Sequence, residues 1–226
     1  MIAIDARGYF ITGSDTGVGK TYIACEIIRQ LRESNIAVET RKPAESGCET
    51  NHQGESICAD AQSLQLANKN QETIETIAAY RFRAALAPHR AARLEGKELY
   101  LEQLLDACEL DNSANLLIVE GAGGFYSPLA ENGLNADLAT GLQLAVIIVV
   151  DDRIGAVNQA LMSIQAVESR QLHIAAIVLN QVTPDHLADM DNLVDLGAHC
   201  DYPLFRCLHA TPLESLFEDK HAKIQA

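Results

Sequence analysis

The amino-acid sequence predicts an α/β protein with a doubly wound, mainly parallel β-sheet and helices on both of its faces. Short apolar runs rich in β-branched residues recur along the chain, and segments with helical periodicity lie between them. Three of these runs, 116–119, 145–150 and 174–179, are continuously apolar, which is typical of strands buried on both faces. Two further runs, 9–12 and 36–40, complete the predicted set of strands.

Helices are predicted for residues 21–32, 99–110, 157–169 and 187–196. In the first of these segments the apolar residues recur every three or four positions and form one stripe. Parallel strands that alternate with helices are joined by right-handed crossovers, and ligands bind beyond the carboxyl ends of such strands. The loops that follow the strands are therefore the places where functional residues are expected.

Length and composition predict a single domain that spans residues 1–226. The chain is 48% hydrophobic and 21% charged, and it contains no internal repeat or linker that would divide it. Its net charge of −14 disfavours nucleic acids and anionic membranes as partners, and no apolar run approaches the roughly 18 residues of a membrane span. These features favour a small-molecule partner.

The beginning of the chain and its cysteines predict a cytoplasmic protein with free thiols. Residues 1–8 lack the basic region and the long apolar stretch of a signal peptide. The six cysteines show no tight repeating spacing, so in a reducing compartment we expect all of them to be free. Cys200 and Cys207 lie near His199 and His209, but without a Cys-x-x-Cys pair this segment does not favour a zinc site.

A phosphate-binding loop is predicted where the first strand ends. The segment Gly13-Ser-Asp-Thr-Gly-Val-Gly-Lys-Thr21 runs directly into a helix, so backbone N–H groups and the helix N-terminus can surround an anion. Lys20 would contact the β- and γ-phosphates, and the hydroxyl of Thr21 would bind magnesium. The strict pattern places its first glycine at position 14, which is Ser14 here. This motif indicates the P-loop NTPase type of α/β sheet.

Charged residues follow two other strands of the predicted sheet. Glu120 ends a buried strand and precedes the glycine-rich segment 121–124, which favours a cation ligand over a solvated acid. Asp60 alone is explained equally well as an acid at a helix N-terminus. Lys42 follows the second predicted strand, beside the phosphate-binding loop, where positive charge would serve phosphoryl transfer.

Taken together and in this order, the motifs closely resemble those of dethiobiotin synthetases, from about residue 9 to residue 184. The phosphate-binding loop alone indicates only a P-loop ATPase, whereas Lys-Pro-x-x-Ser-Gly followed by Glu-Gly-Ala-Gly-Gly is specific to fewer families. The motifs that carry the resemblance are 13–21, Lys42-Pro-Ala-Glu-Ser-Gly47, Asp60, Pro88-His89, Val119-Glu-Gly-Ala-Gly-Gly124 and Val178-Leu-Asn180.

The resemblance implies an ATP-dependent cyclo-ligase of biotin biosynthesis. Its substrates would be 7,8-diaminopelargonate, CO2 and ATP, with Mg2+ as cofactor. One amine captures CO2 as a carbamate, a carbamate oxygen attacks the γ-phosphate, and the second amine displaces phosphate from the mixed carbamic–phosphoric anhydride. The protein would mainly position and neutralise these groups, which suits lysines, backbone amides and magnesium.

The same resemblance assigns expected roles by position. Lys20, Lys42 and Thr16 are the expected catalytic residues, the two lysines stabilising charge on the γ-phosphate and the carbamate. Thr16 and Ser46 resemble the groups that bind the diamine or its carbamate.

The expected magnesium ligands are Thr21, Asp60 and Glu120. The expected ATP-binding residues are Gly17, Val18, Gly19, Lys20, Thr21, Tyr22, Asp60, Glu120, Gly121, Ala122, Gly123 and Asn180.

Two of these expectations concern segments far from the phosphate-binding loop. Asn180 resembles the family's adenine-reading amide, although from its position at a strand end alone a turn residue is the favoured interpretation. Gly155 and Asn158 lie in Ile154-Gly-Ala-Val-Asn158, which resembles the segment that offers helix N-terminal amides to the substrate carboxylate across a family homodimer. The resemblance therefore implies a homodimer with shared sites.

The sequence departs from the family pattern at three places. Gly17 stands where some members carry an acidic residue, and segment 154–159 reads Ile-Gly-Ala-Val-Asn-Gln where Leu-Gly-x-Ile-Asn-His is frequent. The late Gly-x-Ile/Leu-Pro turn has become Arg206-Cys-Leu-His209. Because that turn helps to frame the nucleotide base, the departure predicts relaxed selectivity among nucleoside triphosphates.

Two alternative functions remain at this point. The first is a P-loop switch ATPase related to partition ATPases, but Ser14 and Asp15 stand near the start of the loop, where those proteins carry a signature lysine. The second is a paralogue that binds nucleotide without turnover, which the intact Lys20, Thr21 and Lys42 disfavour.

Overall fold

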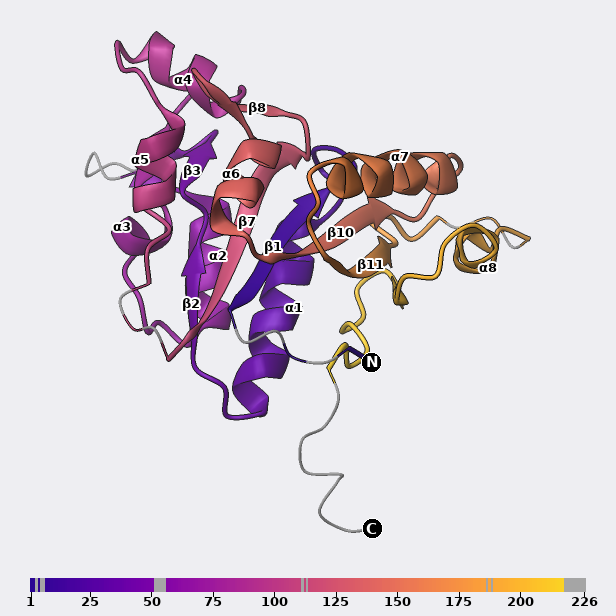
Figure 1. The fold of residues 1–226 in the computed structure, drawn as a ribbon. Helices are drawn as coiled ribbons and strands as arrows, with labels where there is room; N and C mark the ends of the chain where they lie inside the picture. The colour runs from indigo at the N-terminus through magenta and orange to yellow at the C-terminus, as the bar shows by residue number, and fades with distance from the viewer. Residues whose placement is uncertain are drawn as a thin grey trace.

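A six-stranded parallel sheet forms the centre of the molecule (Figure 1). The computed structural model describes residues 1–2, 4, 7–50, 56–110, 112, 114–185, 187 and 189–217. Across the sheet the strands are β12 (Leu204–Cys207), β11 (Ile174–Asn180), β10 (Ala145–Asp151), β1 (Gly8–Gly13), β7 (Leu116–Gly124) and β2 (Val38–Arg41).

Helices cover both faces of this sheet (Figure 1). Successive residues of β1 point to opposite sides, so Tyr9 and Ile11 belong to one buried apolar cluster and Phe10 to the other. The first cluster joins the sheet to α1 (Lys20–Glu33), α2 (Ala59–Ala67) and α3 (Ile74–Ile77). The second joins it to α4 (Pro88–Leu94), α5 (Leu101–Asp106), α6 (Asn135–Leu142), α7 (Ala156–Ser169) and α8 (Asn192–Gly197).

Three short ribbons flank the central sheet. They are the parallel pair β3 (Ala44–Ser46) with β6 (Tyr80–Phe82), and the antiparallel pairs β4 (Glu49–Thr50) with β5 (Ser56–Ile57) and β8 (Pro128–Ala130) with β9 (Gly133–Leu134). β3 follows β2 at the carboxyl edge of the sheet and carries the chain from Lys42 towards α2.

The predicted parallel, doubly wound sheet is confirmed, and each of the five predicted strands overlaps an observed one. Two helix predictions were too long: 99–110 contains a helix only from Leu101 to Asp106, and 187–196 only from Asn192. The late start of α8 has a local cause, because the side chain of Asp191 accepts a hydrogen bond from the Val194 amide and thereby caps the helix. β12 was not predicted.

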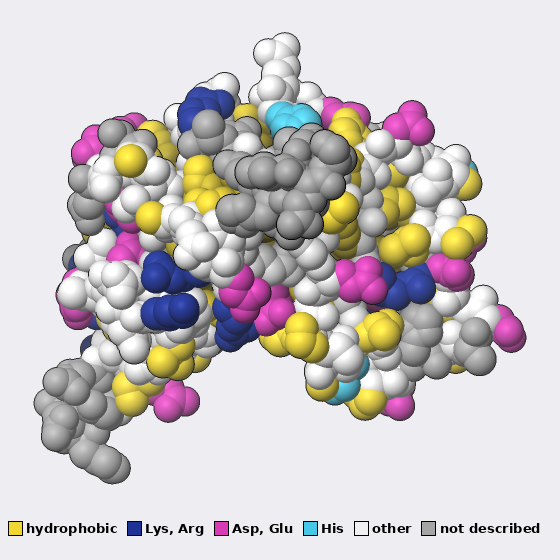
Figure 2. Space-filling model, turned by 90° about the horizontal axis from the view of Figure 1, so that it is seen from below, with side chains coloured by type: hydrophobic (Ala, Val, Ile, Leu, Met, Phe, Trp, Pro, Cys, Tyr) yellow, Lys and Arg dark blue, Asp and Glu magenta, His cyan; other side chains and the backbone are white. Residues whose placement is uncertain are grey.

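The lower surface of the molecule, in the orientation of Figure 1, carries side chains of both charges and hydrophobic side chains. Seen from below, acidic and basic side chains lie next to one another and to hydrophobic ones (Figure 2). The longest described helices, α1 and α7, have 14 residues each, and no helix within the described ranges is long and apolar enough to cross a bilayer.

Candidate active site

A cavity of about 550 Å³ opens at the carboxyl edge of the sheet, where the loops after β1, β2 and β7 meet the start of α2. This is the edge at which parallel α/β sheets bind ligands. The residues that line the cavity are Thr16, Gly17, Gly19, Lys20, Thr21, Lys42, Glu45, Ser46, Asp60, Ala85, Leu86, Ala87, Pro88, Glu120, Ala122, Gly123, Ser127 and Pro128.

The loop between β1 and α1 has the conformation of a phosphate-binding loop. Gly17 and Gly19 have φ angles of 79° and 87°, the left-handed region that favours glycine. A Cβ at Gly19 would lie 2.1 Å from Nδ2 of Asn180, which itself donates a 2.9 Å hydrogen bond to the carbonyl of Val18. Asn180, at the end of β11, therefore holds the loop from behind.

Lys20 is the first residue of α1, and only 7% of its surface is exposed. Its ammonium group donates a 2.8 Å hydrogen bond to the carbonyl of Asp15 in the same loop. Burial lowers the pKa of Lys20, although the nearby Glu120 acts in the opposite direction. Thr21, the next residue, donates from its hydroxyl to Oε1 of Glu120 at 2.8 Å.

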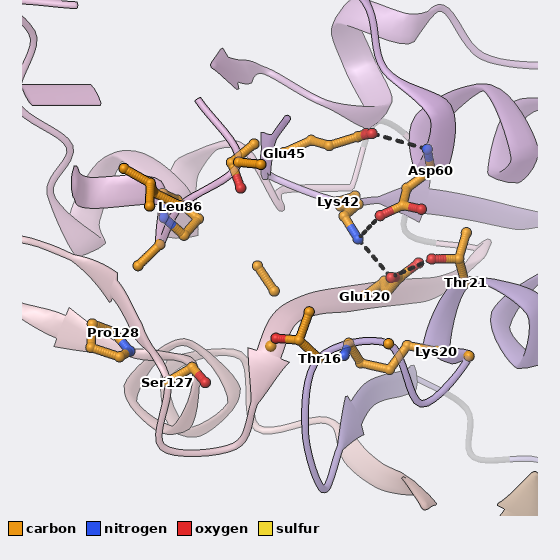
Figure 3. Close-up of a pocket in the computed structure, with 18 residues that line it drawn as sticks. Thr16, Lys20, Thr21, Lys42, Glu45, Asp60, Leu86, Glu120, Ser127 and Pro128 are labelled. Carbon is orange, nitrogen blue, oxygen red and sulfur yellow. Dashed lines mark hydrogen bonds and ion pairs between the residues drawn. The ribbon is translucent and has the colours of Figure 1, made fainter. Parts of the chain in front are cut away.

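The centre of the cavity wall is an ion-pair cluster of Lys42, Glu120 and Asp60 (Figure 3). Nζ of Lys42 lies 2.6 Å from Oε1 of Glu120 and 2.5 Å from Oδ2 of Asp60. Burial alone would lower the pKa of Lys42, but the two carboxylates outweigh it and raise the pKa above its ordinary value. Burial would likewise raise the pKa of Asp60, but Lys42 holds it below the ordinary value. Lys42 and Asp60 are therefore charged at neutral pH.

These residues fit a hard divalent cation. Glu120 is 2% exposed, and its Oε2 atom is buried without a hydrogen-bond partner among the residues that the structure describes. Buried carboxylate oxygens are normally paired, so an unpaired one beside a phosphate-binding loop is a ready ligand. Thr21 and Asp60 add a hydroxyl and a carboxylate on the same side, which are the oxygen ligands that Mg2+ prefers.

The glycine-rich end of β7 is held by Asn135, the first residue of α6. This side chain is fully buried; its Oδ1 accepts from the Ala122 amide at 2.9 Å, and its Nδ2 donates to the carbonyls of Ala122 and Ser127. Gly123 has a φ of 83°, and its backbone lines the cavity. Sequence reasoning missed Asn135, because nothing in its spacing links it to segment 121–124.

A family model described as an AAA domain matches residues 7–215. An ATP-dependent dethiobiotin synthetase of Ruthia magnifica is 42% identical over 80% of this chain and 83% of its own length. A second, from Anaeromyxobacter dehalogenans strain 2CP-C, is 40% identical over 93% of this chain and 89% of its own. The chain belongs to the ATP-dependent dethiobiotin synthetase family. The resemblance inferred from the motifs is thereby confirmed.

Solved structures agree on the type of fold. The signal recognition particle receptor FtsY of Elizabethkingia anophelis matches with a TM-score of 0.53 at 14% identity, over 94% of this chain and 60% of the receptor. At that identity the likeness concerns the fold alone, and it confirms the α/β sheet of P-loop type expected for a dethiobiotin synthetase.

Most residues expected to act in this synthetase come together at the cavity, but some do not line it. Val18, Gly121 and Asn180 are buried and do not line the cavity, and Tyr22 donates from its hydroxyl to the carbonyl of Thr211. Gly155 and Asn158 lie at the start of α7, where both are exposed. The expected residues thus divide into those that line the cavity, those that lie behind or beside it, and a separate pair at the start of α7.

The expectation that all cysteines are free was wrong. Cys48 and Cys58 form a disulfide, while Cys25, Cys108 and Cys200 are free thiols, as is Cys207. The two half-cystines are ten positions apart, and the sequence offered no signal because their spacing matches no framework motif. The bond joins the segment that follows β3 to the residue that precedes α2. Ser46 is the last residue of β3, and Asp60 lies in the first turn of α2.

Glu45 is a second residue that sequence reasoning missed. It is 4% exposed, and its two carboxylate oxygens accept from the amides of Asp60 and Ala61, each at 2.9 Å. Burial raises the pKa of Glu45, while these two hydrogen bonds and the charge of Lys42 oppose the rise. Within the described chain, Glu45, Cys48 and Cys58 form the one group of three His, Cys, Asp or Glu side chains with metal-ligand spacing, but its sulfurs are already bonded to each other.

Proposed function

We propose that this chain catalyses ATP-dependent closure of the cyclic urea of dethiobiotin from 7,8-diaminopelargonate and CO2. The observation that carries the proposal is the Lys42–Glu120–Asp60 cluster at the mouth of a phosphate-binding loop, in a chain that is 42% identical to a dethiobiotin synthetase. The cluster supplies one fixed positive charge within reach of a transferred phosphoryl group.

The reaction needs three bond-forming steps. An amine of the diamine attacks CO2 and loses a proton, which gives a carbamate. A carbamate oxygen then attacks the γ-phosphorus, and ADP leaves. The second amine attacks the carbonyl carbon of this mixed anhydride, phosphate leaves, and the amine gives up a proton. Because the chemistry is mostly positioning and charge neutralisation, the site needs cations and backbone donors more than a nucleophilic side chain.

Each step has candidate groups in the cavity. Lys42 would neutralise the carbamate and the phosphoryl oxygens, and Lys20 would leave the Asp15 carbonyl to contact the γ-phosphate. Thr16 and Ser46 line the cavity and would bind the diamine or its carbamate. The other expected nucleotide contacts also form part of this proposal. They include a contact of Tyr22 with ATP and a contact of Asn180 with adenine.

Magnesium would be held by Thr21, Asp60 and Glu120, and it would supply charge neutralisation on the β- and γ-phosphates. The unpaired Oε2 of Glu120 supports this assignment. Oε1 of the same carboxylate is already shared by Lys42 and Thr21, which fixes the plane of the carboxylate before any ligand arrives.

We further propose that the enzyme is a cytoplasmic homodimer. Gly155 is the N-cap of α7 and has no side-chain cap, so the first amides of that helix are available to a carboxylate. Ile154, which precedes the N-cap, and Met162 on α7 are 72% and 63% exposed, which suits burial against a second copy. Light scattering coupled to size-exclusion chromatography tests the dimer, and cell fractionation tests the location. The net charge of −14 supports a small-molecule partner rather than nucleic acid or membrane.

The deciding experiment incubates the purified protein with 7,8-diaminopelargonate, labelled bicarbonate and MgATP. We expect label in dethiobiotin and an equal amount of released phosphate. Phosphate without labelled product would instead identify an ATPase with another role, such as a switch ATPase. The absence of both signals would identify a nucleotide-binding paralogue without turnover.

A further inference from the structure

The start of helix α2 lacks a cap of its own. Its N-cap residue is Cys58, whose side chain makes no capping hydrogen bond to the helix. A cysteine sulfur is a weak acceptor, and caps are normally serine, threonine, aspartate or asparagine. The amides of Asp60 and Ala61, in the first turn, would therefore be left without a partner inside the helix.

Glu45 supplies this cap from another segment of the chain. It lies on β3, 15 residues before Asp60, and each of its carboxylate oxygens takes one of the two amides. The hydrogen bonds are charge-assisted, and the negative charge faces the positive end of the helix dipole. Although Glu45 lines the cavity, both of its oxygens are engaged by the helix, and Figure 3 shows the contact with Asp60.

The cap closes a ring of contacts around Asp60. The backbone amide of Asp60 is bonded to Glu45, and its side chain is bonded to Lys42, three residues earlier in the same segment as Glu45. The first turn of α2 is thus fixed against segment 42–45 at two points. Loss of the Glu45 contact would leave the direction of the Asp60 carboxylate, and through it the ammonium of Lys42, less well defined.

We propose that Glu45 is a positioning residue of the synthetase: it caps α2 from β3 and thereby holds Asp60 against Lys42. This inference rests on the proposed function for its kinetic readout, whereas its structural readout is independent of any activity. Glu45 acts through Asp60 and touches neither phosphate nor diamine.

The test compares Glu45→Ala, Glu45→Gln and a repaired variant, Glu45→Ala with Cys58→Ser. Serine at an N-cap can accept from the same two amides, and the extended backbone at position 58, with φ −112° and ψ 106°, suits a capping residue. All proteins, wild type included, are kept reduced so that the Cys48–Cys58 bond is absent from each of them. Cys58→Ser alone and Glu49→Gln, an exposed acid nearby, are the matched controls.

The first readout is amide hydrogen exchange at Asp60 and Ala61 in the ligand-free protein. Exchange should accelerate roughly tenfold or more in Glu45→Ala, less in Glu45→Gln, and return towards the wild-type rate in the repaired variant. Unchanged exchange in Glu45→Ala would overturn the capping role, whether or not the protein makes dethiobiotin.

The second readout is the split between kcat and KM. Glu45→Ala should lower kcat about tenfold to a hundredfold with a smaller change in KM for ATP, and the repaired variant should recover most of that loss. If exchange protection returns but kcat does not, Glu45 contacts a reacting group and the positioning role is wrong. If Glu45→Ala fails to fold, Glu45→Gln, which keeps one acceptor oxygen, carries the same comparison.

Discussion

Lys42 and Glu120, 78 residues apart in the sequence, meet in the cavity wall with 2.6 Å between the ammonium nitrogen and the nearer carboxylate oxygen. Because Oε1 of Glu120 also accepts from Thr21, one buried carboxylate connects the segment after β2 with the first turn of α1. A lysine held in this way points its charge in one direction before any ligand binds.

Replacement of Lys42 by alanine should therefore damage turnover more than folding. We expect kcat to fall by roughly a hundredfold or more, because the variant loses the cation that would stabilise the phosphoryl and carbamate oxygens. Binding of MgATP, measured by calorimetry, should stay within a few fold of wild type. Lys97→Ala, at an exposed lysine, is the control, and near-normal kcat in Lys42→Ala would refute the assigned role.

Replacement of Glu120 by glutamine should change the response to magnesium. The variant keeps the size of the side chain and one acceptor oxygen, but it loses the charge that a divalent cation needs. We expect the magnesium concentration for half-maximal rate to rise about tenfold or more, together with a lower kcat. Glu33→Gln, at an exposed residue of α1, is the control. A magnesium titration identical to that of wild type would exclude Glu120 as a ligand.

The buried thiol of Cys25 predicts a loss of stability in alkaline solution. Burial raises its pKa from the ordinary 9.0 to about 12, so the folded protein keeps a proton that the unfolded chain releases. Its contribution to stability is full below pH 9 and is lost as the pH rises towards 12, by up to about 1.4 kcal/mol per pH unit. Cys25→Ala should lose less free energy of unfolding than wild type between pH 9 and pH 11. Urea titrations at several pH values measure this difference, and parallel curves would contradict it.

The Cys48–Cys58 disulfide predicts both a labelling pattern and a stability difference. Alkylation of the unfolded, unreduced protein should modify four of the six cysteines. Reduction should lower the free energy of unfolding by about 3 kcal/mol, the chain-entropy value for a loop of this length. The double variant Cys48→Ser, Cys58→Ser should then be insensitive to reductant. Modification of all six cysteines in oxidised protein would show that the bond does not form.

Nucleotide selectivity tests the departure at the end of the chain. Arg206 and Cys207 belong to β12 and stand where the family pattern has a glycine–proline turn. Arg206 forms ion pairs with Asp152 and Asp191. We expect CTP and GTP to support dethiobiotin formation within about tenfold of ATP in kcat/KM, a difference of roughly 1.4 kcal/mol. A strong preference for ATP in steady-state assays would show that other residues frame the base.

The strands that are buried on both faces of the sheet were predictable from the sequence. Continuous β-branched runs predict strands buried on both faces, and β7, β10 and β11 are such strands. β12 escaped prediction because its four residues, Leu-Phe-Arg-Cys, show no such run and three of them are only partly buried. Its place in the sheet depends on pairing with β11, a contact that sequence spacing does not encode.

The same distinction holds at the cavity. Lys20 and Thr21 follow the loop after β1, and Glu120 lies in β7 immediately before its glycine-rich carboxyl end, so their meeting at one sheet edge follows from topology. Glu45 and Asn135 accept hydrogen bonds from backbone amides in other segments of the chain. No sequence motif predicts a side chain that caps another element. Family resemblance supplied Asp60, for which local sequence offered only the ordinary reading of a helix-start acid.

The hydrogen bond from Lys20 to the Asp15 carbonyl bears on the cost of nucleotide binding. The ammonium holds the loop in a closed conformation through this bond, and Asn180 supports the other side of the loop at Val18. On binding of a triphosphate, Lys20 would replace its hydrogen bond to the Asp15 carbonyl with one to a phosphate oxygen, and the loop would not have to become ordered. Little conformational entropy would be lost on association, so more of the phosphate contact energy remains available as affinity.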